Sequence, residues 1–328
     1  MQQQLTGLDM VQIDIANSYG MDKEDWMTRL LWCEVHENQL EEMISTADEP
    51  LMYIKAVMAY RDAQAGIPSG HNMFLDATAS GLQILAALSG CKKTAKHVNM
   101  INTGNREDVY IEVATAMNKL LPDHQQVDRS LVKKPVMTHY YNKIRQDILS
   151  EEQENAFYTV LAESFEGAEA VKDYINTQWN RDALEHQWTL PDGHVSRVLV
   201  TEMKTARIEV DELNHTTFAY RFECNEPSSI SSSLVPNIVH SIDGYIVREM
   251  IRKAHSEDFQ LAHIFDAFTA HPNHMVRVTE MYREVLADIA SSNLLQDIMD
   301  EIRGEHKPLI KFSNDLDVEI MKSEYMLS

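Results

Sequence analysis

The chain has 328 residues, 44% of them hydrophobic, and a formal net charge of −22. This length allows one large domain or two to three subdomains with a substantial core. The acidic excess argues against nucleic-acid binding by the chain as a whole, since phosphate contacts require Lys and Arg; local basic clusters or a basic partner would have to supply them.

The N-terminal sequence MQQQLTGLDMVQIDIANSYG has no basic segment followed by an apolar core, so no signal peptide is expected. No apolar run reaches 18 residues, which excludes a membrane-spanning helix and a membrane partner. Three scattered cysteines, Cys33, Cys91 and Cys224, have no pair spacing and indicate a reducing compartment. We therefore expect a cytoplasmic protein.

Two helices are predicted near the N-terminus. Residues 22–47 place apolar side chains three and four positions apart, as on one face of a helix. Residues 50–61 predict a second helix, with Asp48 as its N-cap and Pro50 in its first turn.

The run MFLDA (73–77) predicts a buried strand that contains Asp76, and SGLQILAALSG (80–90) predicts the helix after it. A carboxylate on a buried strand is costly unless it is paired or binds a cation. Asp76 could instead cap the helix or form an Asx-turn, with about even weight from this stretch alone, although Ser80 competes for the cap.

The rest of the chain alternates irregularly between helical and strand patterns, which indicates an α+β fold. Helical spacing recurs at 106–120, 151–175, 236–254 and 271–289. Residues 190–224 alternate apolar and polar side chains around turn signals, which predicts two or three strands in an exposed hairpin. Residues 259–271 predict a buried strand with Asp266 inside it.

Asp76 and Asp266 share one context, a carboxylate in an apolar strand. If the two strands are neighbours, the mutual repulsion of the carboxylates requires cations. Mg²⁺ uses few protein carboxylates and keeps positions for water and phosphates, and two metals about 3.5–4 Å apart suit in-line phosphoryl displacement. The alternative for Asp266 is a strand-end residue paired with a nearby cation.

The segment 129–145 is locally basic, with five cations and no acid: Arg129, Lys133, Lys134, Lys143 and Arg145. Arg129, Lys133, Met137 and Tyr141 recur every four residues and would share one face of a helix. Two cations one turn apart suit a triphosphate, and a tyrosine suits stacking on a base. A solvated basic face is the blander alternative, and Pro135, which costs roughly 3 kcal/mol inside a helix, predicts a kink or a later start.

Together these segments resemble the single-subunit DNA-dependent RNA polymerases of phages and mitochondria. Asp76-x3-Ser80-Gly81-Leu82-Gln83 is similar to motif A of that family, Arg129-x3-Lys133-x3-Met137-Thr138-x2-Tyr141 to motif B, and Asp266-Ala267-Phe268 to motif C. The order and spacing also agree, and the resemblance covers nearly the whole chain. Further similar segments lie at 15–23, 48–60, 98–121, 187–193 and 236–244.

The resemblance implies a fold and a division of the chain. It implies a palm, a small antiparallel sheet with helices, and a mainly helical fingers subdomain. The N-terminal helices and the first part of the palm are expected at 1–103, the fingers and a protruding β-hairpin at 104–235, and the second part of the palm with a short terminal foot at 236–328.

The resemblance also implies residue roles. Asp76 and Asp266, with the carbonyl of Ala77, would hold two Mg²⁺ ions. Arg129 and Lys133 would contact the incoming ribonucleoside triphosphate, and Lys133 would protonate the leaving pyrophosphate. The remaining expected substrate contacts are Met137, Tyr141 near the insertion site and in ribose selection, Gly81 in ribose selection, His240 near the 2′-hydroxyl, and Tyr110, a fingers aromatic.

This sequence departs from the family pattern in places. Asn142 follows Tyr141 where the family has Gly, and Phe265 precedes Asp266 where the family often has His. Only 75 residues precede Asp76, and none match the N-terminal domain or the thumb of the family. We therefore expect a second protein chain to supply those parts, as in heterodimeric phage enzymes, with DNA template, RNA product and ribonucleoside triphosphates as the other partners, in the host cytoplasm if the protein is encoded by a phage.

Rival functions remain open. A family A DNA polymerase shares the three-motif plan, but it carries a Glu at the position of Gly81, which blocks the ribose 2′-hydroxyl. A non-catalytic scaffold subunit has no need of the carboxylate pair. A metallohydrolase built on His263, His271 and His274 lacks HExxH-type spacing. The hairpin lies where the family carries a DNA-recognition loop, and its alternation fits packing against a partner equally well.

Overall fold

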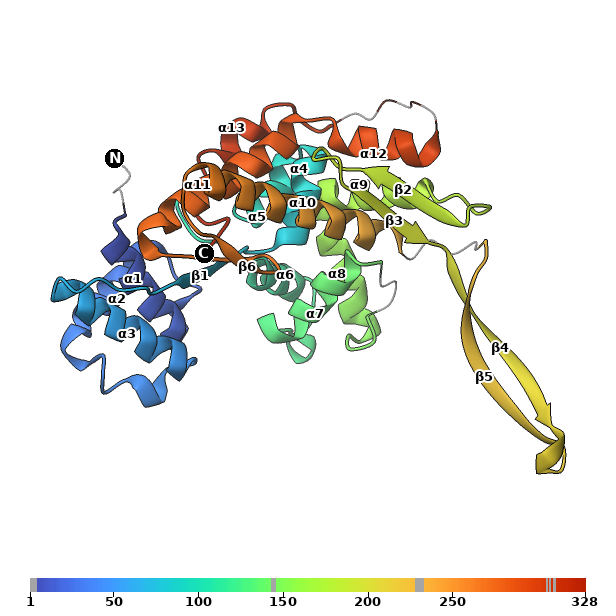
Figure 1. Cartoon of the computed structure of the whole chain (residues 1–328), viewed down its shortest axis with the longest axis horizontal. Coiled ribbons are helices and arrows are strands. Elements are labelled where there is room, and N and C mark those ends of the chain that lie inside the picture. Colours follow the sequence, from blue (N-terminus) through green and yellow to red (C-terminus); the bar gives the residue numbers. More distant parts are fainter. Residues whose placement is uncertain (1–4, 143–145, 228–232, 305, 307, 309–310) are drawn as a thin grey trace.

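The structure is a computed structural model that describes residues 5–142, 146–227, 233–304, 306, 308 and 311–328. The expected α+β class is confirmed, because the described residues form many helices, one three-stranded antiparallel sheet and two separate hairpins (Figure 1). No helix in these ranges combines the length and apolar character needed to cross a membrane. Short 3-10 or π turns occur at Asn17–Met21, Glu37–Gln39, Ile44–Thr46, Asp123–Gln125 and Asp211–Leu213.

Three N-terminal helices form a unit with a small core of its own: α1 (Gly7–Ala16), α2 (Trp26–Val35) and α3 (Pro50–Gln64), with α1 packed against the other two. The prediction of one helix over 22–47 is wrong. The chain leaves the helix after α2, since Leu40 is buried in this core and its carbonyl accepts a hydrogen bond from Tyr53 Oη at 3.0 Å. Glu49, not Asp48, is the cap residue of α3, and Pro50 occupies its first turn as expected.

The three-stranded sheet joins segments almost 200 residues apart in the sequence. Strand β1 (Met73–Asp76) pairs antiparallel with β7 (Ala267–Ala270), and β7 pairs with β6 (Ala262–Ile264). The register places Met73 opposite Ala270 and Asp76 opposite Ala267. The predicted single buried strand over 259–271 is therefore wrong: it is a hairpin whose turn is Phe265–Asp266, and β6 is exposed.

The main core forms around α4 (Ser80–Ser89), which packs against α9 (Glu166–Thr177), α10 (Leu234–Ser256) and α11 (Pro272–Ser291). α4 is buried from Leu82 to Ser89. The buried Gln83 amide is satisfied, since its Nε2 donates to the Val98 carbonyl at 3.0 Å and its Oε1 accepts from Tyr282 Oη at 2.8 Å. Shorter helices complete this part: α5 (Lys92–His97), α12 (Leu294–Arg303) and α13 (Leu316–Ile320).

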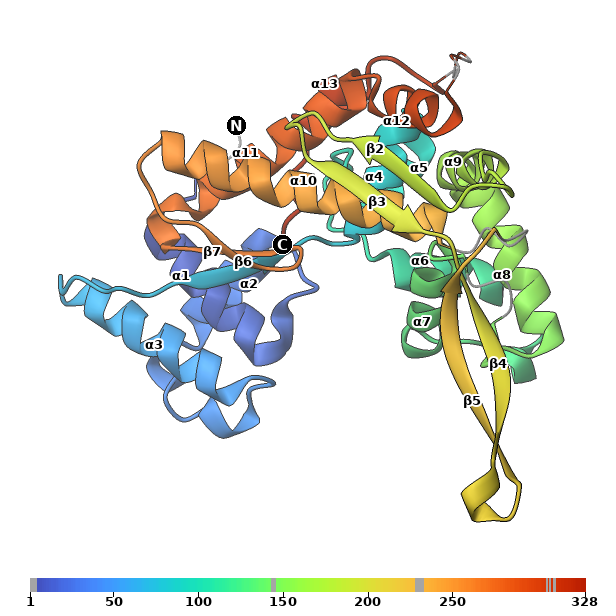
Figure 2. The same ribbon diagram turned by 45° about the vertical axis from the view of Figure 1, so that its right-hand side comes forward.

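A helical lobe lies on the other side of the sheet from the N-terminal unit (Figure 2). It contains α6 (Val109–Asn118), α7 (Arg129–His139) and α8 (Glu151–Ser164), with α9 packed beside α8. Each helix begins at a polar cap whose side chain accepts a backbone N–H: Asp108, Asp128 and Ser150.

Two hairpins follow the helical lobe. β2 (Glu185–Thr189) and β3 (Val195–Leu199) rest on the body of the protein, where Trp188 is buried and its Nε1 donates to Ser241 Oγ at 3.0 Å. β4 (Thr201–Val210) and β5 (Thr216–Asn225) pair over ten residues each and project away from the body (Figures 1 and 2). The expected protruding hairpin is thus β4–β5, and β2–β3 is a separate one.

Candidate active site

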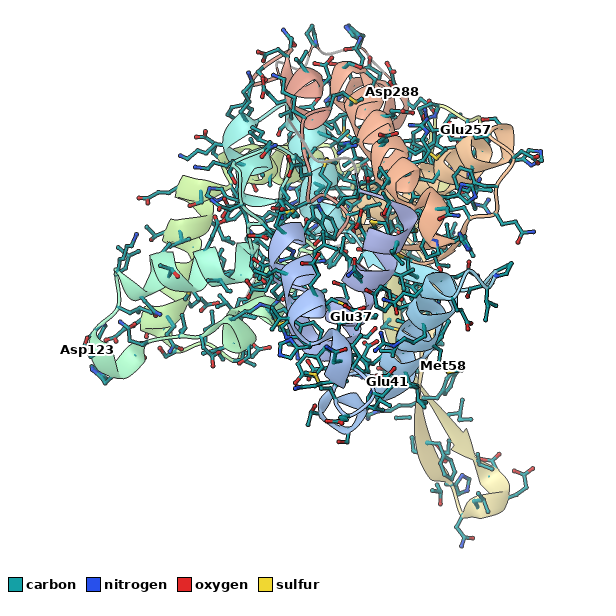
Figure 3. The ribbon with its side chains drawn as sticks, turned by 90° about the vertical axis from the view of Figure 1, so that its left-hand side faces the viewer. Glu37, Glu41, Met58, Asp123, Glu257 and Asp288 are labelled. Atoms are coloured by element: carbon teal, nitrogen blue, oxygen red, sulfur yellow. The ribbon has the colours of Figure 1, made fainter. Side chains whose placement is uncertain are left out.

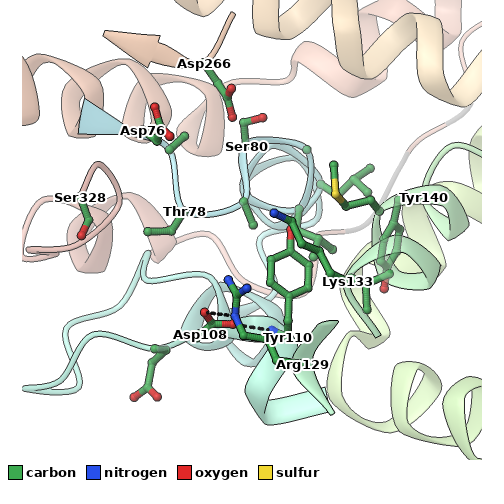
Figure 4. Close-up of a pocket in the computed structure, with 18 of the residues that line it drawn as sticks. Asp76, Thr78, Ser80, Asp108, Tyr110, Arg129, Lys133, Tyr140, Asp266 and Ser328 are labelled. Carbon is green, nitrogen blue, oxygen red and sulfur yellow. Dashed lines mark hydrogen bonds and ion pairs between the residues drawn. The ribbon is translucent and has the colours of Figure 1, made fainter. Parts of the chain in front are cut away.

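A cavity of about 260 Å³ lies where the end of β1, the start of α4, the start of α6, α7 and the β6–β7 turn converge (Figure 4). Its lining contains nine of the ten residues expected from the sequence: Asp76, Ala77, Gly81, Tyr110, Arg129, Lys133, Met137, Tyr141 and Asp266. Segments separated by almost 200 residues therefore meet in one pocket, as the ordered motifs indicate.

Asp76 and Asp266 lie at adjacent strand ends. Asp76 is the last residue of β1 and faces Ala267, and the N–H of Ala77 donates to the Asp266 carbonyl at 3.2 Å. The prediction that both carboxylates are buried within strands is wrong: Asp76 is exposed and Asp266 is half-buried in a two-residue turn. Phe265 allows this turn by adopting a φ of 55°, which moves the carboxylate out of the strand.

Neither Asp76 nor Ser80 caps the following helix. The cap residue of α4 is Ala79, which makes no side-chain capping hydrogen bond. The Asp76 carbonyl accepts the N–H of Ser328 at 2.9 Å. This hydrogen bond fixes the backbone of Asp76, while its carboxylate lines the pocket. Among the described residues, no hydrogen-bond donor reaches the Ala77 carbonyl.

The carboxylate side of the pocket favours cations. Although the Asp76 residue as a whole is exposed, surrounding protein atoms partly desolvate its carboxyl, and this desolvation, together with the neighbouring charge of Asp266, raises its pKa. A third carboxyl, Asp243 on α10, does not line the cavity but is affected in the same way: burial and the charge of Asp266 raise its pKa to about 6, although His263 opposes the shift. Acids that repel one another at a pocket wall provide the hard oxygen ligands that Mg²⁺ takes.

The opposite side of the pocket carries the cations (Figure 4). α7 begins at Arg129, because Asp128 Oδ1 accepts the Leu131 N–H at 2.8 Å, and it continues through Pro135. Arg129, Lys133 and Met137 follow one another by one turn along the pocket wall.

Tyr141 lies beyond His139, the last residue of α7. The four residues that were expected to share one helix face are therefore not all helical, although Tyr141 still lines the pocket. Asn142 after it adopts a φ of 62°, the left-handed conformation expected where the family has Gly. Lys143 and Arg145 of the basic segment lie outside the described residues.

Three residues expected to sense the sugar lie together. A Cβ added at Gly81 would contact Tyr141 Oη and Val239 Cγ1, each at 3.7 Å. The ring of Tyr141 lies 5.1 Å from that of His240, which is exposed and does not itself line the cavity. Burial raises the pKa of Tyr141, so its hydroxyl stays protonated at neutral pH.

A family model of the DNA-dependent RNA polymerases matches residues 2–150 and 159–325. The chain belongs to this family. The match covers both halves of the pocket, and the expected single-subunit type is confirmed by relatives that are mitochondrial and chloroplast enzymes.

The relatives of this polymerase-family chain are much longer than the chain itself. It is 22% identical to the mitochondrial DNA-directed RNA polymerase of Schizosaccharomyces pombe over 92% of the chain and 32% of the relative. It is 23% identical to a probable DNA-directed RNA polymerase of Gelasinospora (96% and 45%) and 24% identical to the chloroplastic DNA-directed RNA polymerase 3 of Nicotiana sylvestris (98% and 40%). The chain thus spans between about a third and under half of these relatives.

Sequence reasoning missed Asp108, which links the two helices of the pocket in this polymerase-family chain. Asp108 Oδ1 accepts the N–H of Tyr110 at 3.0 Å and caps α6, while Asp108 Oδ2 accepts Arg129 Nε at 2.9 Å. The Arg129 guanidinium carbon lies 5.3 Å from the centre of the Tyr110 ring, and Lys133 Nζ lies 6.0 Å from it. The only signal in the sequence is an acid directly before a helix, which predicts the cap but not the ion pair.

Further polar residues in the lining were also missed: Asp22, Lys23, Arg106 and Ser328. Arg106 Nε and Arg29 Nη2 both donate to Ser328 Oγ, at 2.8 and 2.7 Å. Arg29 is fully buried, and burial together with the charge of Arg106 lowers its pKa to about 9. Lys23 and Arg106 add positive charge to the same cavity.

In the described part of the chain, one group of three metal-type side chains has its ligand atoms within 4.8 Å of one another: Glu209, Asp211 and His215. All three are exposed at the tip of the β4–β5 hairpin, away from the pocket (Figure 1). Exposed acids gather in this way without a metal, and this group has no part in the expected magnesium site.

Proposed function

We propose that this chain is the catalytic part of a DNA-directed RNA polymerase and performs template-directed ribonucleotidyl transfer. The observation that carries the proposal is the meeting of Asp76 and Asp266 in one pocket, across from Arg129 and Lys133. The proposed palm consists of the β1–β7–β6 sheet with its helices, and the proposed fingers of the α6–α9 lobe. We divide the chain at 1–103, 104–235 and 236–328.

The donor set fits two Mg²⁺ ions, which we assign to Asp76, Asp266 and the Ala77 carbonyl. All these donors are oxygen atoms. Desolvation and the charge of Asp266 both raise the pKa of Asp76, and bound cations would offset both effects. When bound, two such ions lower the pKa of the RNA 3′-hydroxyl and neutralise the triphosphate.

The cationic side of the pocket acts on the triphosphate. Arg129 and Lys133 bind its oxygens, and Lys133 donates a proton to the leaving pyrophosphate. Asp108 holds Arg129 from behind through Nε, which leaves the terminal guanidinium nitrogens for phosphate. Electrostatic stabilisation of this kind, aimed at the charge of the transition state, is commonly the largest contribution to catalysis.

The sugar contacts favour ribonucleotides over deoxyribonucleotides. Gly81 presents no side chain toward Tyr141, so the space that a Glu would fill in a family A DNA polymerase stays open for a 2′-hydroxyl. Tyr141 and His240 lie beside that space, Met137 lies on the adjacent wall, and Tyr110 supports the cations.

The charge of the chain bears on its partners. We propose that a second, more basic protein chain supplies the N-terminal domain and thumb, because a chain with a net charge of −22 needs basic surface from elsewhere to bind DNA. A heterodimeric bacteriophage enzyme acting in the host cytoplasm fits this proposal, whereas the relatives named above are organellar. The other proposed partners are the DNA template and the RNA product.

The test is nucleotide incorporation on a primed DNA template by the chain together with the partner that co-purifies with it from the native source. Asp76→Asn and Asp266→Asn should each lower ribonucleotide incorporation by about 10³-fold or more, since an amide replaces a metal-binding carboxylate. Asp123→Asn, at an exposed edge of the molecule (Figure 3), should leave it unchanged.

Full activity of the Asp76→Asn variant would overturn the assignment of the pocket. Preferential incorporation of deoxyribonucleotides by the unaltered complex would favour the family A DNA polymerase alternative. A complex that incorporates neither would support the scaffold alternative.

A further inference from the structure

Arg106 is a cation of the pocket to which the proposed chemistry gives no role. It lies in the loop before α6 and lines the same cavity as Asp76 and Arg129. Its Nε donates a hydrogen bond to Ser328 Oγ at 2.8 Å. In the part of the chain that the structure describes, its terminal nitrogens Nη1 and Nη2 have neither a hydrogen-bond partner nor an ion-pair partner. Both nitrogens are therefore available to a ligand in the cavity.

A buried network holds Arg106 in place. Ser328 Oγ also accepts a hydrogen bond from Arg29 Nη2 at 2.7 Å, and Arg29 is fully buried. The other nitrogens of Arg29 are bound as well, since Nε donates to the Glu24 carbonyl and Nη1 to Asn17 Oδ1, each at 2.9 Å. The hydroxyl that holds Arg106 is therefore fixed by a second guanidinium, and Arg106 is anchored through Nε alone.

Arg129 is anchored in the same way. Its Nε donates to Asp108 Oδ2 at 2.9 Å, and its terminal nitrogens make no hydrogen bond or ion pair with the described residues. A guanidinium that is bound only through Nε offers two terminal nitrogens, whose N–H groups match two oxygens of a phosphate. Since Arg129 is proposed to bind the triphosphate, the same arrangement at Arg106 indicates a further position for phosphate oxygens.

Arg106 has no counterion of its own among the described residues. Burial lowers its pKa and the charge of Arg129 lowers it further, although Asp108 and Asp22 oppose the shift. Both acids have other partners. Asp108 accepts hydrogen bonds from Arg129 and from the first turn of α6, and Asp22 forms an ion pair with Lys23. A partly desolvated guanidinium without a partner is costly, and a bound anion would remove that cost.

The position of Arg106 indicates which anion it meets. Ser328, which holds Arg106, also donates its N–H to the Asp76 carbonyl at 2.9 Å, so Arg106 is linked through one residue to the proposed metal-binding side. The charge of Arg129 reaches it from the other side. An anion on Arg106 is therefore a phosphate group close to the reacting atoms.

We propose that Arg106 is a third phosphate-binding residue of the nucleotidyl transfer, beside Arg129 and Lys133. This inference rests on the proposed function. Two substrates bring phosphate oxygens to such a pocket: the incoming ribonucleoside triphosphate, and the phosphodiester next to the 3′ end of the RNA. The chemistry of recognition is the same for both, and the experiment distinguishes them.

The experiment measures binding by the full chain without reaction. One ligand is ATP with Mg²⁺, and the other is an RNA primer that ends in a 3′-deoxynucleotide and is annealed to a DNA template. Arg106→Gln should weaken binding of one ligand at least about tenfold and of the other less than about twofold, because a charge-assisted bidentate contact is lost. The ligand that is weakened identifies the source of the phosphate. Unchanged binding of both ligands, equal losses for both, or no binding of either by the unaltered chain would overturn the proposal.

Three further variants separate a phosphate contact from a general effect of charge or folding. Arg181→Gln removes the same charge from an exposed position outside the cavity and should change binding of either ligand less than about twofold. Arg106→Lys keeps the charge but not the fork, and Ser328→Ala removes the hydroxyl that anchors the fork. Each should weaken the same ligand as Arg106→Gln by a smaller factor of about three. An equal loss in the Arg181→Gln variant would contradict the proposal.

Steady-state incorporation separates this inference from the proposed function. A chain that binds one ligand through Arg106 but incorporates no ribonucleotide, alone or with its partner, would contradict the proposed function and support this inference. Ribonucleotide incorporation by the Arg106→Gln variant with unchanged KM for both the triphosphate and the primed template would contradict this inference alone.

Discussion

The pocket and the β4–β5 hairpin are built from opposite kinds of contact. The pocket gathers residues from segments spread along the chain between Asp22 and Ser328, and its walls rest on the main core. The hairpin is made from 25 consecutive residues that pair with one another, and its strands contribute none of the buried residues of that core.

Because of this difference, the two regions should tolerate amino-acid substitutions differently. In the pocket, functional side chains are fixed by long-range packing, so small changes in a helix cap or a turn alter the chemistry. In the hairpin, side-chain direction is fixed by local alternation alone, so substitutions change the surface and leave the fold intact. Three substitutions and one replacement of a whole segment, in order of decreasing expected effect, test this contrast.

The largest effect is expected at Gly81. Gly81→Glu would direct a carboxylate toward Tyr141 and the space for the 2′-hydroxyl, and should lower ribonucleotide incorporation roughly 100-fold or more relative to deoxyribonucleotide incorporation. Gly81→Ala is the matched control, because its Cβ makes ordinary 3.7 Å contacts. Competition between labelled rNTP and dNTP measures the ratio, and an unchanged ratio in the Glu variant would exclude Gly81 from sugar selection.

A smaller effect is expected at Asp108, where capping and charge can be separated. Asp108→Asn keeps an oxygen to accept the Tyr110 N–H but loses the charge that holds Arg129, so kcat/KM should fall about tenfold with little loss of stability. Asp108→Ala should lose a further ~1 kcal/mol of unfolding free energy with the cap. If both variants show equal kcat/KM and equal stability to the unaltered chain, the double role of Asp108 is wrong.

The third effect is on stability and has a pH signature. The pKa of Asp243 is raised to about 6 by burial and the charge of Asp266, so between about pH 4 and 6 the folded chain binds more protons at this site than the unfolded chain does. The contribution of Asp243 to unfolding free energy therefore falls as pH rises through that window and stays low above it. Without metal, Asp243→Asn should add on the order of 1–2 kcal/mol at pH 7 and nothing at pH 3.5.

Urea unfolding of the Asp243→Asn variant and the unaltered chain at both pH values measures this difference. A variant that is less stable at pH 7 would contradict the destabilising role of the carboxyl.

The smallest effect is expected from the hairpin. Replacement of residues 203–223 by an Asn-Gly turn keeps the base of the hairpin, where Glu202 pairs with Cys224. The unfolding free energy should change by less than about 0.5 kcal/mol, because the removed part covers none of the main core. A loss of more than about 2 kcal/mol would show that the hairpin supports the body and would remove the contrast with the pocket.

The strand at 73–76, the helix after it and the convergence of three motifs could be predicted from the sequence, because apolar runs and motif order are properties of the chain itself. The two strands around Asp266 could not. Phe265 adopts a positive φ that an aromatic residue rarely adopts, so nothing in AHIFDAF indicates a turn.

The pairing of Asp108 with Arg129 was also beyond the sequence, because the second oxygen of a capping carboxylate finds its partner only in the folded chain. The same holds for the end of α2. Apolar spacing continues past Val35, but the burial of Leu40 against Tyr53 overrides it. Local sequence patterns thus predict where helices and strands form, whereas tertiary contacts determine where they end and which side chains pair.

The pairing of β1 with β7 also sets the minimum time that the sheet needs to form during synthesis. A ribosome that adds about 5–20 residues per second needs about 10–40 s to pass from Asp76 to Asp266. During that interval the helical lobe is synthesised, and the emerging chain has Asp76 but no partner strand for β1. Translation products that stop before Asp266 therefore lack one of the two acids on which the proposed chemistry depends.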